Sequence, residues 1–340
     1  MKSPEISTLD QPWPYEQLEQ VESCPYCGSS ERTIAYDDVK DWTFYFAQGK
    51  WSYWDCKVCQ TLYLNPRPIE PSIYKAYTNY YTHYSKDSFV QGIKVRLRNE
   101  CLAHSLNANF RPRLHLPKSL GFILKPINKK ISLAFDEESL IALPKKRLLD
   151  VGCGNGSKLK FAKEIGWDVT GLEIDPSALA VMERSLNVIE GGWVELAKFE
   201  NSFDCIICSH VLEHVYNPLL LLRLLFNALK SKGVLMLSLP NAKSRMRTVF
   251  GANWRGLEAP RHIAIPTLTK IIEQLEELGY VEICQSHVND ATSLESYRIK
   301  ARKQYLSTFE RNLLNIKIKF LSRQVDSNQS DFIQLRACKK

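Results

Sequence analysis

Three glycines and two acidic residues carry the clearest chemical signal in this sequence. Gly152, Gly154 and Gly156 follow an apolar run, and glycine is needed where the backbone takes a positive φ or where a ligand approaches too closely for a side chain. Their G-x-G-x-G spacing differs from the G-x-G-x-x-G of dinucleotide-binding loops. Asp150 precedes the first glycine, and Glu173 ends the next apolar run, where a carboxylate can accept hydrogen bonds from both ribose hydroxyls. These residues predict a nucleotide-type ligand facing the loop amides.

Four of the ten cysteines have the spacing of metal ligands. Cys24 with Cys27, and Cys56 with Cys59, form two Cys-x-x-Cys pairs, and each pair can direct two sulfurs at one ion. Because four cysteines leave no position for a water ligand, the pattern predicts a structural zinc site. An iron–sulfur cluster and four unrelated buried thiols are the alternatives.

Three histidines are candidate general bases. His210 and His214 lie in the segment Ser-His-Val-Leu-Glu-His-Val, and His262 lies in a later polar loop. A neutral imidazole can take a proton from a hydroxyl or a carbon acid near pH 7. The alternatives are ligand-wall packing for His210, packing or hydrogen bonding on a helix for His214, and a structural loop role for His262. Glu213 is either structural or assists a divalent ion.

The polar and aromatic loop around His262 also offers substrate contacts, because loops at the carboxyl ends of strands carry such contacts in open sheets. Trp254 is predicted to stack on a substrate ring, and Arg261 to bind a phosphate.

The elements that position these residues alternate between strand and helix from residue 146 onward, which predicts a mostly parallel sheet in an α/β fold. Asp175 and Pro176 predict a helix start, and this helix is expected to run to about Leu186. Further helices are predicted from Pro218, over 267–278 and, as one long basic helix, over 294–323. The seven predicted strands are 147–151, 169–173, 187–190, 203–208, 233–239, 280–287 and 332–338.

The part before residue 146 is predicted to contain smaller modules. Residues 1–20 are interpreted as a tail, 21–85 as a zinc ribbon followed by a tyrosine-rich helix, and 86–145 as a basic helical linker that caps the ligand site. Aromatic runs at 42–46 and 51–54 predict a hairpin between the two cysteine pairs. The tyrosines of the helix either pack between modules or line a substrate pocket. The basic residues either are solvated or dock a phosphorylated or membrane-bound substrate.

Together these motifs resemble known enzymes. The loop Asp-Val-Gly-Cys-Gly-Asn-Gly with Glu173 resembles motifs I and II of the class I S-adenosylmethionine-dependent methyltransferases, and Val-Leu-Glu-His-Val resembles small-molecule methyltransferases, including quinone O-methylating enzymes. The ribbon, an Asn-Pro-Arg-Pro turn and the Pro-Arg-His loop resemble zinc-ribbon methyltransferases of bacterial gene clusters for polysaccharides, modified sugars and secondary products. The resemblance covers roughly 22–85 and 145–285.

This resemblance implies a Rossmann-like seven-stranded sheet with helices on both faces. It implies S-adenosylmethionine as the methyl donor, with Asp150, the three loop glycines, Glu173 and Ser209 as its contacts. The implied reaction is methylation of an oxygen or carbon atom of a small acceptor, which we expect to be a sugar or sugar-phosphate derivative. A phosphorylated and a nucleotide-linked acceptor both stay open. The segments 86–146 and 290–325 are not explained by it.

The composition is compatible with a cytoplasmic enzyme. The 340 residues are 44% hydrophobic and carry a formal net charge of +8, which favours an acidic partner. The N-terminus lacks an apolar core, so we expect no signal peptide, and no apolar run is long enough to cross a membrane. Peripheral membrane contact stays open. The alternatives to a small-molecule enzyme are an RNA methyltransferase that binds phosphates through ribbon and linker, and a non-catalytic cofactor-binding scaffold.

Overall fold

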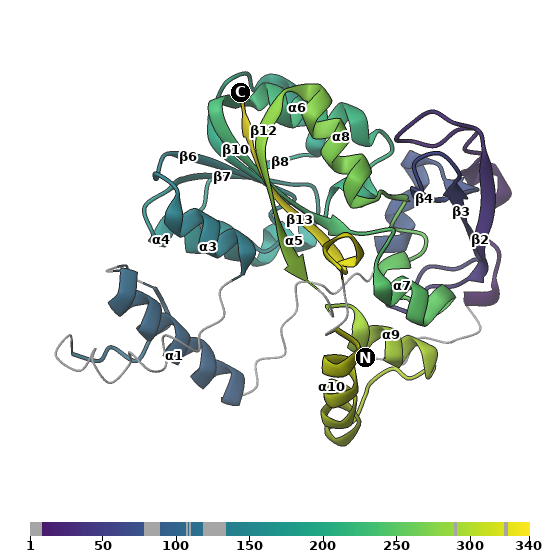
Figure 1. The fold of residues 1–340 in the computed structure, drawn as a ribbon. Coiled ribbons are helices and arrows are strands. Elements are labelled where there is room, and N and C mark those ends of the chain that lie inside the picture. The colour runs from purple at the N-terminus through teal and green to yellow at the C-terminus, as the bar shows by residue number, and fades with distance from the viewer. Residues whose placement is uncertain are drawn as a thin grey trace. The chain divides into compact units, whose positions relative to one another are not determined.

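The computed structural model describes residues 9–77, 89–106, 108, 110–117, 134–288, 291–322 and 326–340 (Figure 1). The described residues form two compact units. Unit 1 comprises those in the ranges 1–80, 208–226 and 235–340, and unit 2 those in the ranges 81–207 and 227–234. The paired cysteines and the three candidate histidines therefore belong to unit 1, whereas the glycine loop belongs to unit 2.

A seven-stranded sheet is the main element of the fold, with the strand order β12-β13-β10-β9-β6-β7-β8. β6 pairs in parallel with β7, and β7 with β8, whereas β12 and β13 are antiparallel. This sheet confirms the predicted Rossmann-like architecture. Its strands are β6 (Arg147–Val151), β7 (Asp168–Glu173), β8 (Val188–Glu190), β9 (Phe203–Ser209), β10 (Leu229–Pro240), β12 (Tyr280–Val288) and β13 (Phe332–Lys339).

The helices between these strands start where the sequence signals them. α4 (Ser157–Glu164) follows the glycine loop, and α6 (Pro218–Ala228) begins at the predicted proline. α8 (Leu268–Leu278) is followed by Gly279 as its C-cap, whose φ of 99° suits only glycine well. α5 (Pro176–Val181) has Asp175 as its N-cap, and the Asp175 carboxylate accepts a hydrogen bond from the amide of Ser177.

Two predicted helices differ from the structure. α5 ends at Val181 rather than near Leu186, because the chain becomes extended at Met182 and the side chains of Met182 and Leu186 lie against Gly156. The predicted helix 294–323 is two helices, α9 (Ser293–Lys300) and α10 (Thr308–Ser322).

The break between α9 and α10 has a local cause. The amide of Glu310 donates to the hydroxyl of Ser307 at 3.2 Å, and the amide of Ser307 donates to the carboxylate of Glu310 at 2.8 Å. This reciprocal pair is a capping box, which starts a new helix at this point.

A second sheet in unit 1 carries the cysteine pairs, with the order β11-β4-β3-β2. β2 (Arg32–Val39), β3 (Trp51–Cys56) and β4 (Leu62–Leu64), which we call the ribbon, are three of its strands, and β2 and β3 pair as an antiparallel hairpin. The predicted strand at 42–46 is wrong: this stretch is a turn, because the Asp41 carboxylate accepts hydrogen bonds from three amides within it and just after it, those of Phe44, Phe46 and Ala47.

The fourth strand of this sheet, β11 (Ala264–Ile265), comes from the polar loop that follows β10. It pairs with β4, and the register aligns Ala264 with Tyr63. The loop also contains the short helix α7 (Arg245–Phe250) and two 3₁₀ turns at 251–253 and 255–257. The loop predicted to contact substrate is thus built into the ribbon.

Residues 9–20 are not the tail that the sequence suggests. Leu9 and Trp13 are buried, and the Trp13 ring meets the Trp51 ring edge-on, with centroids 5.5 Å apart. β1 (Leu18–Glu19) pairs with β5 (Arg67–Pro68). These contacts join the described N-terminal residues to unit 1.

The remaining predicted segments are described only in part. A 3₁₀ helix spans Glu70–Tyr77, with Tyr74 exposed and Tyr77 half-buried, and Tyr80, Tyr81 and Tyr84 lie outside the described residues. In unit 2, α1 (Phe89–Leu106) and α3 (Phe135–Ala142) are helical as predicted, and residues 118–133 are again outside the described part. Among the described residues no helix is long and apolar enough to cross a membrane.

Candidate functional site

The glycine loop joins the end of β6 to α4 in unit 2. Gly152, Gly154 and Gly156 have φ values of 68°, 56° and 74°, the left-handed region that side chains disfavour. A Cβ on Gly156 would also lie 2.8 Å from Leu186 Cδ1. The loop therefore requires glycine at these positions, as the sequence predicts.

Glu173, at the end of β7, is bonded directly to this loop. One of its carboxylate oxygens accepts a hydrogen bond of 2.7 Å from the amide of Gly154. The other accepts two hydrogen bonds of 2.8 Å, from the amides of Ile174 and Asp175. The carboxylate is thus held rigidly. Oε1 already accepts two hydrogen bonds, whereas Oε2 accepts one and keeps a lone pair for a ligand hydroxyl.

Asp150 lies at the end of β6 and is 2% exposed. Its Oδ2 atom is buried and has no hydrogen-bond partner among the described residues. Burial raises the pKa of Asp150 to about 7, with the nearby acids Asp136 and Glu173 adding to the effect and Lys158 opposing it. A buried oxygen without a partner, beside a glycine loop, fits a ligand that brings a hydrogen-bond donor.

Gly171 is a site residue that the sequence analysis missed. A Cβ at this position in β7 would lie 2.6 Å from Leu159 Cδ1 and 2.7 Å from Cys153 Sγ. Glycine therefore lets the loop and α4 pack closely on the strand. The available signal was a glycine inside a predicted strand, which often marks a close approach of another segment.

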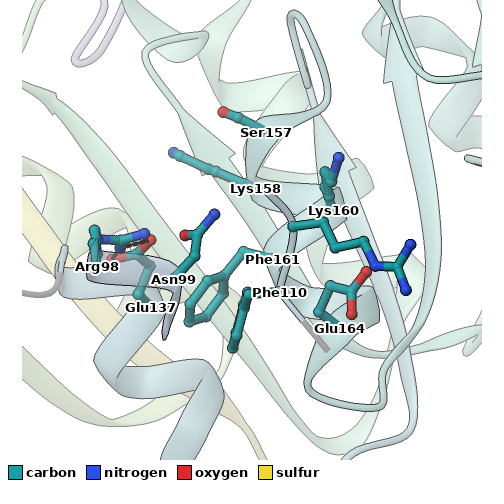
Figure 2. Close-up of a pocket in the computed structure, with 10 residues that line it drawn as sticks. Arg98, Asn99, Phe110, Glu137, Ser157, Lys158, Lys160, Phe161 and Glu164 are labelled. Carbon is teal, nitrogen blue, oxygen red and sulfur yellow. Dashed lines mark hydrogen bonds and ion pairs between the residues drawn. The ribbon is translucent and has the colours of Figure 1, made fainter. Parts of the chain in front are cut away.

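The basic segment before residue 146 contributes to a small cavity in unit 2 (Figure 2). Arg98 of α1 forms an ion pair with Glu137 of α3 at 2.5 Å, and the rings of Phe110 and Phe161 are 5.4 Å apart. The cavity has a volume of about 180 Å³ and is lined by Arg98, Asn99, Phe110, Arg111, Glu137, Ser157, Lys158, Lys160, Phe161 and Glu164. The described part of this segment contacts the helix that begins at the glycine loop, and its role as a cap stays a prediction.

His210 follows Ser209, the half-buried last residue of β9. The φ of His210 is 57°, which is unusual for a residue other than glycine. The His210 amide donates to the carbonyl of Ser238 at 2.7 Å. The imidazole Nδ1 is 3.0 Å from Oε1 of Glu213, and 43% of the His210 side chain is exposed. The ring thus keeps one edge on a buried carboxylate, and part of it reaches solvent.

Glu213 is fully buried in unit 1, and its second oxygen, Oε2, has no hydrogen-bond partner among the described residues. Burial alone would raise the pKa of this carboxyl, but the hydrogen bond from His210 and the neighbouring His214 and His262 hold it below its ordinary value. A carboxylate is therefore available to orient His210 and to stabilise a positive charge on its ring.

His214 and His262 are less accessible than His210. Their rings pack edge-on with centroids 4.7 Å apart, and His214 Nδ1 lies 3.0 Å from the Tyr77 hydroxyl. His262 Nδ1 is 2.6 Å from the Gly256 carbonyl, and its Nε2 is 3.4 Å from the Glu258 carboxylate. Burial lowers the pKa of His262 to about 4. Both rings are engaged by protein groups in this arrangement, so their predicted roles as bases stay predictions.

Trp254 and Arg261, predicted to contact substrate, are buried in unit 1. The Trp254 indole N–H donates to the Thr292 hydroxyl at 3.1 Å. The Arg261 guanidinium donates to Asp41 at 2.8 Å and to the Ala76 carbonyl at 2.8 Å. Both side chains thus hold the loop in place, and a substrate contact stays a prediction that would require the loop to open.

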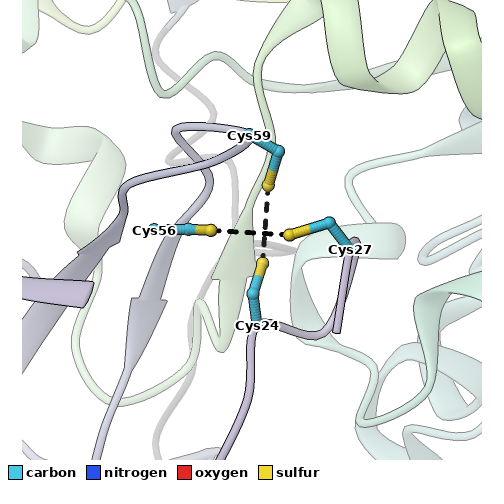
Figure 3. Close-up of side chains that lie close together, drawn as sticks. All are labelled: Cys24, Cys27, Cys56 and Cys59. Atoms are coloured by element: carbon cyan, nitrogen blue, oxygen red, sulfur yellow. Dashed lines mark hydrogen bonds between the residues drawn. The ribbon is translucent and has the colours of Figure 1, made fainter. Parts of the chain in front are cut away.

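The four paired cysteines converge in unit 1 (Figure 3). The sulfurs of Cys24 and Cys59, and those of Cys27 and Cys56, are 3.5 Å apart, and all four lie within 4.8 Å of one another. Tetrahedral ligands at the Zn–S distance of about 2.3 Å would be about 3.8 Å apart. The cluster therefore has the donor type and spacing for one tetrahedral metal ion.

The two cysteine turns share the same backbone pattern. In the first, the Gly28 amide donates to the Cys24 carbonyl and the Cys24 amide donates to the Ser29 carbonyl, both at 2.9 Å. In the second, Gln60 and Thr61 make the same two bonds with Cys56, both at 3.0 Å. Gly28 and Gln60 occupy the equivalent left-handed position. Two equal turns facing one another present four sulfurs symmetrically.

About half of this chain matches a known protein family. The family described as Methyltransferase domain matches residues 124–285. The ubiquinone biosynthesis O-methyltransferase of Cronobacter sakazakii is 30% identical over 173 residues, which are 46% of this chain and 69% of that protein. This chain belongs to the class I S-adenosylmethionine-dependent methyltransferases.

Other relatives match the methyltransferase over shorter stretches or at lower identity. The ubiquinone biosynthesis O-methyltransferase of Xanthomonas campestris is 35% identical over 109 residues, 30% of this chain and 46% of that protein, so this chain spans less than half the length of that relative. A crystal structure of a SAM-dependent methyltransferase from Archaeoglobus fulgidus aligns with a TM-score of 0.45 and 21% identity, over 64% of this chain and 99% of that chain.

Proposed function

We propose that this methyltransferase binds S-adenosylmethionine at the glycine loop and transfers its methyl group to an oxygen or carbon atom of a small acceptor. The observation that carries the proposal is the bond between Gly154 and Glu173, which joins the two cofactor motifs of the family into one rigid unit. When bound, S-adenosylmethionine supplies an electrophilic methyl group, and the protein supplies orientation and a proton acceptor.

The cofactor contacts follow from the chemistry of each residue. Glu173 accepts a hydrogen bond from a ribose hydroxyl with the lone pair of Oε2 that the Gly154 amide leaves available. Gly152, Gly154 and Gly156 allow the methionine part to approach the backbone. Asp150 accepts a hydrogen bond at its buried Oδ2, directly or through a water molecule. The family resemblance also assigns Ser209, the last residue of β9, to the cofactor contacts.

We assign the general base to His210. Its Nδ1–H donates to Glu213, which fixes the tautomer that leaves Nε2 free to take a proton from the acceptor. Glu213 then stabilises the imidazolium that forms. Among the three histidines this role suits His210 best, because its side chain is 43% exposed whereas His262 is buried.

Two kinds of similarity bear on the chemical class of the acceptor. Curated relatives are named for O-methylation, which favours an acceptor hydroxyl over a carbon atom. The resemblance of the ribbon and the Pro-Arg-His loop to methyltransferases of polysaccharide and sugar gene clusters supports a sugar or sugar-phosphate derivative. A phenolic hydroxyl is the alternative favoured by the relatives named for ubiquinone biosynthesis.

We also propose that the cluster of Cys24, Cys27, Cys56 and Cys59 holds a structural Zn²⁺. Four thiolates close the coordination shell, so the ion would fold the ribbon and take no part in the chemistry. Peptides of this class gain about 10–16 kcal/mol from zinc on folding. The ribbon sheet also contains β11, so the ion would stabilise the loop that carries His262.

One assay tests the main proposal. Purified protein is incubated with S-adenosylmethionine and panels of nucleotide sugars, sugar phosphates and catechols, and S-adenosylhomocysteine release is measured together with the mass of the product. Turnover that depends on one panel identifies the acceptor class. Cofactor binding by calorimetry without turnover on any panel would favour a scaffold, and methylation of RNA with steep salt dependence would favour the nucleic-acid alternative.

A further inference from the structure

The helix α10 of unit 1 lies beside α9 (Figure 1). It carries three exposed apolar side chains. Phe309, Leu313 and Ile316 are 76%, 60% and 71% exposed. Their spacing of four and three residues puts them on one stripe of the helix, because such positions lie on the same helical face. Ile318 lies about half a helical turn after Ile316 and therefore faces the opposite side of the helix. Its side chain is buried, with 4% exposed, and packs the helix onto the rest of the unit.

This stripe is more than scattered surface hydrophobicity. Single exposed apolar residues are normal on soluble proteins, whereas a contiguous row on one helix marks an interaction surface. The helix contacts α9, and Lys317, four residues after Leu313, lies over the ring of Tyr297 of α9, 5.6 Å from its centroid. The apolar stripe is therefore left outside a helix that is already anchored.

The stretch of chain that contains α10 is strongly basic. The stretch 300–319 contains six basic residues and one acid, Glu310. Glu310 forms an ion pair with Lys303. Five of the six basic residues have described side chains that are exposed: Lys300, Arg302, Lys303, Arg311 and Lys317.

We propose that α10 docks this methyltransferase on an anionic membrane surface. A helix with an aromatic and aliphatic stripe and basic flanks lies in the interface plane of a bilayer, with the apolar side chains among the acyl chains and the cations at the head groups. A second copy of the chain is a poorer occupant, because it would bring the same basic residues together. The inference does not depend on the identity of the methyl acceptor.

The test uses the full chain and sedimentation with vesicles. Wild type is expected to bind vesicles of phosphatidylglycerol and phosphatidylcholine and to bind pure phosphatidylcholine weakly. The triple variant Phe309→Ser, Leu313→Ser, Ile316→Ser is expected to lose at least about tenfold in partitioning, because three apolar side chains no longer leave water. Replacing Lys300, Arg311 and Lys317 with Gln is expected to lose about fivefold per charge.

A matched control removes exposed apolar side chains elsewhere, with Tyr15→Ser, Ile34→Ser and Val194→Ser, which are 86%, 55% and 56% exposed in the wild type. This control should partition like wild type, and circular dichroism should show that all variants stay folded. Equal binding by the α10 variant and wild type would overturn the proposal. So would a wild-type dimer that the α10 variant converts to a monomer without any change in vesicle binding.

Discussion

The amide of Gly154 donates a 2.7 Å hydrogen bond to the carboxylate of Glu173, 19 residues later in the chain. The same carboxylate accepts from the amides of Ile174 and Asp175. Glu173 therefore fixes the shape of the loop as well as offering oxygen atoms to a ribose. The two motifs that the sequence presents separately are one structural unit.

We predict that Glu173→Ala weakens binding of S-adenosylmethionine about 100-fold or more, because both the loop anchor and the ribose acceptor are lost and each charged hydrogen bond is worth about 1.5–3 kcal/mol. Glu173→Gln should lose less, since the amide oxygen still accepts one of these bonds. Calorimetry with S-adenosylhomocysteine measures both. Glu190→Gln, at the end of the neighbouring strand, is the control, and an affinity unchanged in Glu173→Ala would refute the assignment.

Asp150 should make stability depend on pH. Its pKa is about 7 in the folded protein and about 3.9 in an unfolded chain. Between these two pH values the folded state binds one proton more than the unfolded state. The contribution of Asp150 to the free energy of unfolding is therefore complete below about pH 4. It is lost as the pH rises toward 7, by up to about 1.4 kcal/mol per pH unit. Asp150→Asn should abolish this contribution.

The measurement is the free energy of unfolding by urea from pH 4.5 to 8 without cofactor, as the difference between wild type and Asp150→Asn. The advantage of wild type over the variant should shrink as pH rises and level off above about pH 7. A difference that stays constant over this range would mean that Asp150 is not held protonated by burial.

The sequence was sufficient for the sheet and for the glycine loop because those signals are local. Apolar runs give strands, and a positive φ restricts the loop to glycine. The ends of helices were predicted less accurately than the strands. Ser307 and Glu310 form a capping box that divides the predicted helix 294–323, although the basic amphipathic pattern continues through it. The turn at 42–46 is set by Asp41, whose importance no spacing revealed.

Long-range contacts account for the rest of the candidate site. A tryptophan and an arginine in a polar loop suggest exposed ligand contacts, but Arg261 meets Asp41, 220 residues earlier, and Trp254 meets Thr292. β11 pairs with the ribbon strand β4, so the loop is fixed by a module that precedes it by some 200 residues. Sequence spacing cannot supply partners at such separations.

The pairing of His210 with Glu213 predicts a separation of turnover from binding. His210→Ala should lower kcat about 100-fold or more, the usual range for a general base, while cofactor affinity stays near wild type. Glu213→Gln should lower kcat by a smaller factor with little change in KM, because an amide still orients the ring but cannot stabilise the imidazolium. His115→Ala, an exposed histidine in unit 2, is the control. Equal kcat in His210→Ala and wild type would assign the reaction to positioning alone.

The cysteine cluster predicts about one zinc ion per chain by plasma mass spectrometry, following the four-thiolate geometry. Cys24→Ser should lose the metal and lower the melting temperature, because a cluster without its ion leaves the ribbon without its main stabilisation. Cys284→Ser is the matched control, since Cys284 is exposed and outside the cluster. Full zinc content in Cys24→Ser, or iron in the purified wild type, would contradict the proposal.

The ion pair between Asp41 and Arg261 predicts a large coupling energy, because both side chains are fully buried. Asp41 raises the pKa of Arg261 against the opposing effect of burial, so the guanidinium stays charged. Removing one partner leaves the other charge buried and unpaired, which should lower the free energy of unfolding by about 3–5 kcal/mol. Asp41→Asn and Arg261→Gln together should cost less than the sum of the single variants.

A double-mutant cycle by urea unfolding measures the coupling, which we expect to be about 1–3 kcal/mol. The control is Asp38→Asn, whose ion pair with Lys50 is exposed and should contribute no more than about 1 kcal/mol. Because Asp41 also accepts from the amides of Phe44 and Ala47, part of its single-variant cost lies outside the cycle. Additive effects of the two variants would show that Arg261 is held by the Ala76 carbonyl and not by Asp41, and would make its release toward a substrate phosphate plausible.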